Sequence, residues 1–398
     1  MTAMCVVPPN RKRPMHLSLS PIPATPFYYY DTALLGNTLQ AIKDELVGHD
    51  NYHMHYAIKA NANSTILQLI AKAGFGADCV SGGEIQAALD AGFPASKIVY
   101  AGVGKADWEI ELALNAGIAM FNVESLAELE VINEIALRMG KQANVSFRIN
   151  PDVGAHTHAH ITTGLAENKF GIAMTDMVKV IRRSREMGAV HCTGLHFHIG
   201  SQILDTDDFQ ALAIRINELQ DQLESQGITL PNINVGGGLG IDYNEPDAHP
   251  IPDFASYFAT YNRHLKLREG QQLHFELGRA VVGQMGTLVT RVLYIKQGTN
   301  KQFAIVDAGF TDLIRPALYG ALHKVEVLQT DTTVSDACET YDVVGPICES
   351  SDVFARDYAL PHLQRGDCLV LRSAGAYGEI MASQYNCRQL PKVYFDRA

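Results

Sequence analysis

Short apolar runs alternate, over the first two thirds of the chain, with segments in which apolar residues recur at helical spacing. Eight such runs lie at 54–60, 75–81, 97–104, 118–125, 143–150, 192–201, 232–238 and 273–280. Between them, segments such as 64–74 and 126–140 have the three- and four-residue apolar spacing of amphipathic helices. Strands that alternate with helices run parallel, so eight such units predict an α/β fold, a (β/α)8 barrel of the TIM type. A doubly wound open sheet is the alternative.

A glycine follows each of the predicted helices. A glycine ends a helix well because it has no Cβ and adopts the left-handed conformation without steric cost. We therefore expect a left-handed glycine between each helix and the next strand. The glycines in question are Gly74, Gly92, Gly117, Gly140, Gly188, Gly227 and Gly270.

The pattern changes after residue 280. Long β-branched segments at 287–298, 301–310, 341–350 and 367–379 follow one another without regular helical spacing. This pattern predicts a C-terminal all-β domain at 281–398, after a barrel domain at 25–280. The segment 25–31, "TPFYYYD", could contribute a strand to the all-β domain. Residues 1–24 are expected to form a loosely ordered leader, in which Met4 and Met15 leave the true start open.

Composition and charge point to a small-molecule partner. The 398 residues are 47% hydrophobic and 19% charged, as in an ordinary globular protein. A net charge of −11 argues against a broad nucleic-acid or anionic-membrane surface. No apolar run approaches the roughly 18 residues of a membrane span, and the N-terminal segment lacks the long apolar core of a signal peptide. Neither nucleic acid nor a membrane is therefore expected as a partner.

The cysteines indicate a reducing compartment. They are odd in number and form no C-x-x-C pair, so neither a disulfide framework nor a zinc site is predicted. We expect the protein to be cytoplasmic. The seven cysteines are Cys5, Cys79, Cys192, Cys338, Cys348, Cys368 and Cys387.

Several polar residues stand at the ends of predicted strands. Lys59 ends the run "YAIKA", and taken alone it is best explained as an ordinary strand end with its ammonium group in solvent. Glu276 ends the eighth run and Arg279 follows three residues later, a spacing that by itself fits a surface ion pair. Active sites of (β/α)8 barrels lie at the C-terminal ends of the strands, however. We therefore expect these residues, with Asp78 and His198, to share one barrel mouth.

Two histidine groups raise the possibility of a metal site. His156, His158 and His160 form "HTHAH", and His196 and His198 form "HFH", which resembles a motif of metal-dependent barrel hydrolases. Those enzymes need further ligands at later strand ends, and none is obvious, so a metal is not favoured. His196 and His198 face the same side of a strand. A ring there could instead lie flat against an aromatic cofactor.

The combination of polar groups suits pyridoxal 5'-phosphate. Its aldehyde needs a lysine amine for a Schiff base, and its phosphate needs glycine N–H groups, which "VGGGLG" offers after the seventh strand, together with an arginine. A pyridine nitrogen that must stay protonated needs a carboxylate, and Glu276 is available. A protonated ring stabilises the carbanion left by decarboxylation. An alanine racemase is a rival interpretation, but racemases place an arginine on this nitrogen, which keeps it unprotonated, so Glu276 favours decarboxylation.

These motifs together resemble the fold-type III pyridoxal-phosphate-dependent decarboxylases, from about Thr25 to Asn386. Within that family the resemblance is to the members that act on diaminopimelate. It implies decarboxylation of meso-2,6-diaminopimelate to L-lysine in lysine biosynthesis, with no metal. Other lysine or ornithine decarboxylases of the family remain the alternative, and a single-domain pyridoxal-phosphate-binding homeostasis protein would lack residues 281–398. The resemblance rests on "YAIKANAN", "GADCVSGGE", "GVGK", "RINPDVGAHTH", "TGLAENKFGI", "HFHIGSQ", "GGGLG", "DLIRPALY", "VVGPICESSD" and "GAYGEIMASQYN".

The resemblance also implies roles for particular residues. Lys59 would form the Schiff base, His198 would stack on the cofactor ring, and Glu276 would contact the pyridine nitrogen. The other cofactor-binding residues would be Asp78, Ser201, Gly238, Gly240, Gly278, Arg279 and Tyr377. The substrate-binding residues would be Arg279, Arg315, Tyr319, Glu349 and Tyr377. Cys348 would donate a proton to the carbanion, and it and Glu349 would come from the second subunit of a head-to-tail homodimer with shared active sites.

Substrate choice follows from charge. Diaminopimelate differs from lysine by a carboxylate on the far carbon, so a selective pocket needs a cation there and an acceptor for the far ammonium. Arg315 with Tyr319 would bind the far carboxylate, and Glu349 would accept the far ammonium. Ornithine decarboxylases typically have an aspartate after the cysteine and lack this arginine arrangement. One departure from the family is Leu277, which stands where E-P-G-R has proline and so frees an N–H. The chain also ends soon after "VYFDRA", before an extra strand and terminal helix of many members.

Overall fold

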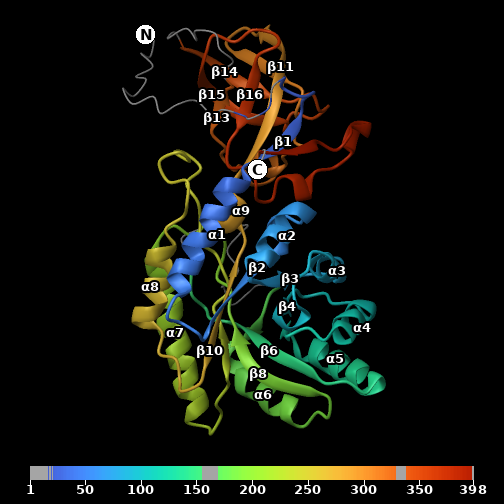
Figure 1. Cartoon of the computed structure of the whole chain (residues 1–398), viewed down its shortest axis with the longest axis vertical. Helices are drawn as coiled ribbons and strands as arrows, with labels where there is room; N and C mark the ends of the chain where they lie inside the picture. Colours follow the sequence, from blue (N-terminus) through green and yellow to red (C-terminus); the bar gives the residue numbers. More distant parts are fainter. Residues whose placement is uncertain (1–16, 18, 20, 155–168, 329–337, 397–398) are drawn as a thin grey trace. The chain divides into compact units, whose positions relative to one another are not determined.

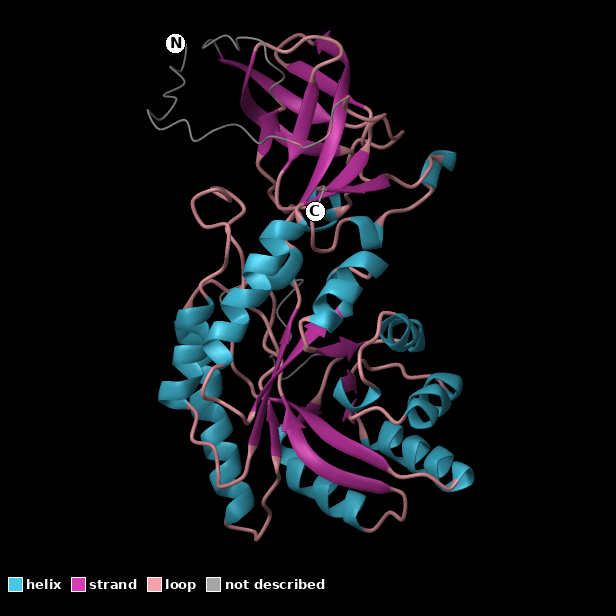
Figure 2. Cartoon of the chain, viewed as in Figure 1, coloured by secondary structure: helices cyan, strands magenta, loops and turns pink. Residues whose placement is uncertain are grey.

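The computed structural model describes residues 17, 19, 21–154, 169–328 and 338–396. These residues form two compact units, which are described separately (Figures 1 and 2). The barrel unit comprises Thr38–Gly240 and Pro252–Val281. The β unit comprises the chain up to Asn37, the segment Ile241–Ile251 and the chain from Val282 onward.

The barrel unit is built around a closed ring of parallel strands. Each of the eight predicted runs overlaps one strand of this ring, and the ring closes because the first strand pairs with the last. The (β/α)8 barrel is therefore confirmed, and the open sheet is excluded. In order around the ring, the strands are β2 (Tyr52–Ala57), β3 (Gly76–Cys79), β4 (Ile98–Tyr100), β5 (Met120–Val123), β6 (Ala143–Asn150), β8 (Val190–His196), β9 (Asn232–Asn234) and β10 (Gln272–Leu277). A two-residue strand, β7 (Ile172–Ala173), pairs with β6 outside the ring.

Helices cover the outside of the ring (Figure 2). Gly117 and Gly140 end α4 and α5 in the left-handed conformation, as predicted. The expectation was wrong at Gly188, because α6 ends in a right-handed cap at Glu186 and Gly188 has no positive φ. No helix in the described residues is long and apolar enough to cross a membrane. The helices of the barrel unit are α2 (Ser64–Lys72), α3 (Gly82–Asp90), α4 (Asp107–Ala116), α5 (Leu126–Met139), α6 (Met177–Arg185), α7 (Thr206–Glu224), α8 (Phe254–His264) and α9 (Arg279–Val282), while α1 (Thr32–Leu46) starts in the β unit and continues into the barrel unit.

Two helix starts that resemble capping boxes turn the chain sharply at the C-terminal ends of β3 and β5, with the glutamate bonding the N–H one residue before the capping serine. Ser81 accepts a hydrogen bond from the Glu84 N–H at 3.1 Å, and Glu84 in turn accepts one from the Val80 N–H at 2.7 Å. Ser125 and Glu128 start α5 in the same manner. A capping box satisfies N–H groups that a helix start would leave without partners. Each strand therefore ends abruptly and presents its last side chains at the barrel mouth.

Strand alternation separates an apolar outer face from a polar interior, as β10 shows. Phe275 points outward and packs edge-on against Phe258 of α8, with ring centroids 4.8 Å apart. His274 and Glu276, its neighbours on either side, point the other way and make polar contacts. Most barrels of this class fill their interior with Val, Ile and Leu. Buried polar side chains here mean that the interior is organised for chemistry as well as packing.

The β unit contains one mixed, mostly antiparallel sheet. Its strands are β1 (Phe27–Tyr30), β11 (Gly286–Gln297), β12 (Gln302–Val306), β13 (Val325–Val327), β14 (Cys338–Val344), β15 (Val353–Pro361), β16 (Cys368–Leu371) and β17 (Lys392–Phe395). The central order is β13-β16-β11-β12-β14-β15, and β1 pairs with β11 and β17. Leu17, Leu19 and Ile22 pack against a core cluster that contains Phe27. A short helix, α10 (Arg315–Tyr319), follows β12.

We expect Phe275→Ala to destabilise the protein by about 3–5 kcal/mol, because it removes a fully buried ring that contacts four other aromatic rings. The measurement is the free energy of urea unfolding. Leu137→Ala is the matched control, since Leu137 is 56% exposed on α5 and should change stability by less than about 0.5 kcal/mol. Equal losses in both variants would contradict the packing described for β10 and α8.

Candidate active site

Polar side chains gather where the barrel strands end. Lys59 lies in a short 3-10 turn, Ile58–Ala60, immediately after β2. Asp78 is on β3, Glu276 on β10, and His198 follows β8 by two residues. The predicted placement at one end of the barrel is therefore what the structure shows for these four residues.

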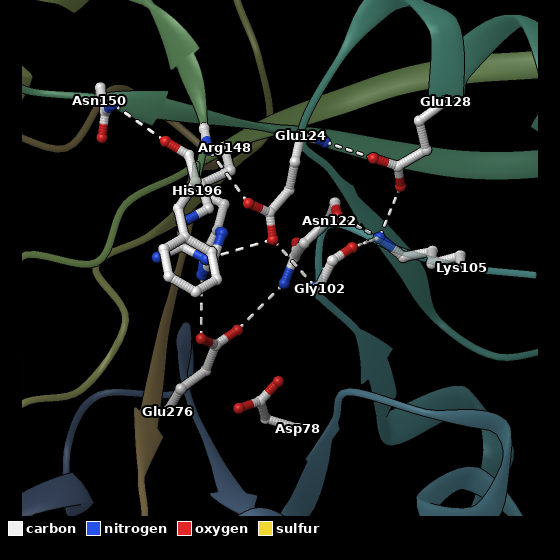
Figure 3. A network of polar contacts seen from close by, with 12 residues as sticks. Asp78, Gly102, Lys105, Asn122, Glu124, Glu128, Arg148, Asn150, His196 and Glu276 are labelled. Carbon is white, nitrogen blue, oxygen red and sulfur yellow. Dashed lines mark hydrogen bonds and ion pairs between the residues drawn. The ribbon is translucent and has the colours of Figure 1, made fainter. Parts of the chain in front are cut away.

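Three N–H donors surround the buried carboxylate of Glu276, and Figure 3 shows Asn122 and His196 among them. Asn122 Nδ2 and Asn234 Nδ2 donate to Oε1 at 3.1 and 2.7 Å. His196 Nε2 lies 2.9 Å from Oε2 and donates to it. The orientation of the Asn234 amide follows from the Gly236 N–H, which donates to Asn234 Oδ1 at 2.9 Å. The arrangement suits an ionised carboxylate, which only accepts hydrogen bonds.

The surroundings keep Glu276 ionised. Burial by itself raises the pKa of Glu276, but nearby His196 and its hydrogen bond, then Lys59, lower that pKa well below the usual range. Hydrogen bonds to the charged form of an acid favour that form. Glu276 is therefore a fixed negative charge at the floor of the barrel mouth.

Lys59 and Asp78 form an ion pair between a reachable amine and a buried acid. Lys59 Nζ contacts Asp78 Oδ2, and the side chains are 37% and 1% exposed. Burial raises the pKa of Asp78 to about 7, the charge of Glu276 adds to the rise, and Lys59 opposes it. Asp78 Oδ1 is buried and has no hydrogen-bond partner among the described residues. One oxygen of Asp78 therefore binds the lysine, while the other has no hydrogen-bond donor among the described residues.

His198 supplies a neutral ring. Burial lowers the pKa of His198 to about 3, and the positive charges of Arg148 and Lys59 contribute to the lowering. Its Nδ1 accepts a hydrogen bond from the Gly237 N–H at 3.4 Å. An uncharged imidazole at this position can lie against an aromatic ligand without adding a positive charge beside it.

The glycine loop after β9 has no space for side chains. A Cβ on Gly237 would lie 1.9 Å from the Glu276 carbonyl oxygen, and one on Gly236 would lie 2.3 Å from the Phe197 carbonyl oxygen. Gly238 and Gly240 are crowded in the same way by Gly200 and Leu204. Such a loop brings backbone N–H groups close to whatever binds there, as phosphate loops do.

Other predicted cofactor residues lie around this loop. Arg279 Nη2 donates to Ser201 Oγ at 3.1 Å. Gly278 lies against Ala57 and Ala60, where a Cβ would come within 3.1 Å of both methyl groups. Leu277 ends β10 in register with Tyr56 of β2 and is 1% exposed, so it continues the strand where the family has proline.

Sequence reasoning missed a second layer of charged residues at the same mouth. Glu124 accepts hydrogen bonds from Arg148 Nη1 at 3.2 Å and from the Gly102 N–H at 3.0 Å (Figure 3). Lys105 Nζ donates to Glu128 and to the Asn122 carbonyl oxygen, at 2.5 and 2.9 Å. Glu124 and Arg148 stand at the ends of β5 and β6, so the rule that identified Lys59 would also have identified them.

The remaining predicted residues belong to the β unit. Arg315 and Tyr319 begin and end α10. Cys348 and Glu349 are exposed on the loop between β14 and β15, where the Tyr385 hydroxyl donates to Glu349 Oε1 at 2.9 Å. Tyr377 follows β16 with a φ of 56°, a conformation unusual for residues other than glycine.

The histidines of "HTHAH" lie outside the described residues. Among the residues that the structure does describe, no group of three or more His, Cys, Asp or Glu side chains is placed to hold a metal ion.

Comparison with known proteins identifies relatives over nearly the whole chain. Residues 34–283 match the family described as "Pyridoxal-dependent decarboxylase, pyridoxal binding domain". The chain is 66% identical over 370 residues to a diaminopimelate decarboxylase of Bacteroides thetaiotaomicron, covering 93% of this chain and 95% of that protein. It is 42% identical over 369 residues to one from Helicobacter pylori, covering 93% and 89%. The crystal structure of a Helicobacter pylori diaminopimelate decarboxylase complexed with L-lysine is similar, with a TM-score of 0.86, 41% identity and coverage of 94% and 91%.

Asp78 should make the cofactor-free protein less stable as pH rises. Its pKa is raised from 3.8 to about 7 in the folded state, so between these values the folded chain holds a proton that the unfolded chain has lost. Stability then falls with increasing pH across that window. Asp78→Asn removes this effect. The free energy of unfolding of the variant minus that of the wild type should therefore be about 2 kcal/mol larger at pH 8 than at pH 5.

Urea denaturation of both proteins at the two pH values measures this difference. Asp90→Asn, at the exposed end of α3, is the matched control for loss of a carboxylate. A difference between Asp78→Asn and wild type that is the same at both pH values would contradict the assignment.

Proposed function

The chain belongs to the pyridoxal-dependent decarboxylases, and we propose that it converts meso-2,6-diaminopimelate to L-lysine and carbon dioxide. The observation that carries the proposal is the ionised carboxylate of Glu276, buried at the end of a barrel that also presents Lys59 and the glycine loop. The relatives that share most of the chain's length support the choice of substrate.

Pyridoxal phosphate fits the residues of the barrel mouth. Gly238, Gly240, Gly278 and Ser201 would surround its phosphate, with Arg279 as the cation and Asp78 beside Lys59. The family resemblance also assigns Tyr377 of the β unit to the cofactor. Cβ atoms on Gly236, Gly237 and Gly238 would meet carbonyl oxygens of the chain itself, so only glycines allow the tight turn that would bring this backbone to a phosphate. Asp78 Oδ1 and His196 Nδ1 are buried without hydrogen-bond partners among the described residues, as expected of a site shaped for a polar ligand.

The chemistry is divided between the cofactor and the chain. When bound, pyridoxal phosphate supplies an electron-withdrawing ring that stabilises the electron pair left when a carboxyl group departs as carbon dioxide. Lys59 would hold the cofactor covalently through its amine, and its side chain is 37% exposed at the barrel mouth. His198, neutral and flat, would stack on the ring.

Glu276 keeps a proton on the pyridine nitrogen. Three N–H groups already bind its carboxylate, so taking up the proton itself would cost Glu276 those hydrogen bonds. Glu276 would therefore keep the proton on a ring nitrogen that lies against it.

The β unit supplies the acid and the substrate contacts. Cys348 donates the proton that replaces the lost carboxyl group, and Glu349 accepts the far ammonium of the substrate. Both side chains are exposed on a single chain, which supports a homodimer in which each subunit completes the site of the other. Arg315 with Tyr319 binds the far carboxylate, and Arg279 and Tyr377 bind the substrate at the cofactor. The described cysteines are all free, which supports a cytoplasmic location.

Substrate choice can be tested by carbon dioxide release from meso-diaminopimelate, L-lysine, L-ornithine and L-arginine. We expect the wild type to prefer meso-diaminopimelate. Arg315→Ala should lower kcat/KM for that substrate by roughly a hundredfold or more, because the far carboxylate is then buried without a partner. A wild type that prefers ornithine or arginine would overturn the proposed substrate.

Shared active sites can be tested by subunit mixing. Lys59→Ala and Cys348→Ala should each be inactive alone, and a mixed heterodimer would retain one intact site of two. Random reassociation should therefore restore about a quarter of wild-type activity. A mixture of Lys59→Ala with the double variant Lys59→Ala/Cys348→Ala contains no intact site and is the control. Verified heterodimers without activity would show that each site is built within one chain.

A further inference from the structure

Arg315 is held on two sides by residues to which the family resemblance assigns no role. Arg315 as a whole is only 5% exposed. Nη1 lies 2.8 Å from His323 Nε2, and the guanidinium carbon lies 4.8 Å from the centre of the Tyr243 ring. The Tyr243 and His323 rings also meet edge to face, with centroids 5.2 Å apart. Each of the three side chains therefore contacts the other two.

The hydrogen-bond partners of His323 determine its tautomer. An arginine only donates hydrogen bonds, so His323 Nε2 must present its lone pair to Arg315. The proton of the neutral ring is then on Nδ1, which donates to the Arg372 carbonyl oxygen at 2.9 Å. His323 therefore orients the guanidinium without contributing a negative charge that would cancel it. A carboxylate in the same place would orient Arg315 but would also neutralise it.

Salt bridges anchor both supports. Arg372, whose carbonyl oxygen holds His323, contacts Asp247 at 2.6 Å and Glu326 at 2.7 Å. Asp247 lies on the same segment as Tyr243, Ile241–Ile251, which belongs to the β unit. Lys324, next to His323, contacts Glu245 of that segment at 3.3 Å. The two supports of Arg315 are thus tied to each other as well as to the arginine.

We propose that His323 and Tyr243 are positioning residues that set substrate selectivity by fixing the plane of the Arg315 guanidinium. This inference rests on the proposed function, in which Arg315 binds the far carboxylate of diaminopimelate. A guanidinium binds a carboxylate best through two parallel N–H donors, and that geometry depends on the plane in which the group is held. Loss of either support leaves the charge in place but frees its orientation.

The test compares a ligand that has the far carboxylate with one that lacks it. His323→Ala and Tyr243→Leu should each raise KM for meso-diaminopimelate about tenfold at matched cofactor occupancy. The inhibition constant of L-lysine, which lacks that carboxylate, should stay within about twofold of wild type. His323→Gln retains an acceptor for Arg315 and should recover part of the loss, and Tyr243→Phe retains the ring and should resemble wild type.

A double-mutant cycle separates positioning from general damage. If His323 acts through Arg315, then adding His323→Ala to Arg315→Ala should change kcat/KM for meso-diaminopimelate by no more than about twofold. Independent, multiplying losses would overturn the inference while leaving the substrate assignment intact. So would an equal weakening of L-lysine binding. A wild type with no activity on meso-diaminopimelate would overturn the proposed function itself, and this inference with it.

Discussion

The ionised carboxylate of Glu276 inside the barrel is the constraint on which the site depends. A buried charge is costly unless hydrogen bonds replace its lost water. Three strands meet this cost, because Asn122 of β5, His196 of β8 and Asn234 of β9 each donate to Glu276 on β10. Four strands of the closed ring must therefore keep their register for the charge to be tolerated. The fold and the chemistry are thus coupled at a single residue.

The glycine loop is bound to the same residue. The Glu276 N–H donates to the Gly236 carbonyl oxygen at 2.7 Å, and the Glu276 carbonyl oxygen lies where a Cβ on Gly237 would be. The groups that suit a phosphate and a ring nitrogen are therefore built on adjoining backbone. The arrangement destabilises the ionised form of Asp78. Burial, together with the charge of Glu276, raises the pKa of Asp78 to about 7. Perturbed acids of this kind are common at active sites.

Local signals predicted most of the architecture but only part of the site. The eight barrel runs could be identified because strands and helices differ in apolar period, and Lys59 and Glu276 could be identified because strand ends face the mouth. The prediction of a left-handed glycine was wrong at Gly188, because a helix can also end in a right-handed cap. Contacts between distant segments left no local signal: Tyr243 precedes the last barrel strand, β10, whereas His323 follows α10, and the two rings meet only through folding. Polar residues inside strands, such as Asn122, likewise resemble ordinary strand residues until the ring closes.

The protonation state of the cofactor nitrogen tests the central claim most directly. The protein can be reconstituted with pyridoxal phosphate carrying 15N in the ring, and the chemical shift of that nitrogen can be measured by NMR at pH 8. Because Glu276 is held as an anion, the nitrogen should be protonated in the wild type and should lose its proton in Glu276→Gln. An unprotonated nitrogen in the wild type, or an unchanged shift in Glu276→Gln, would contradict the role given to this carboxylate.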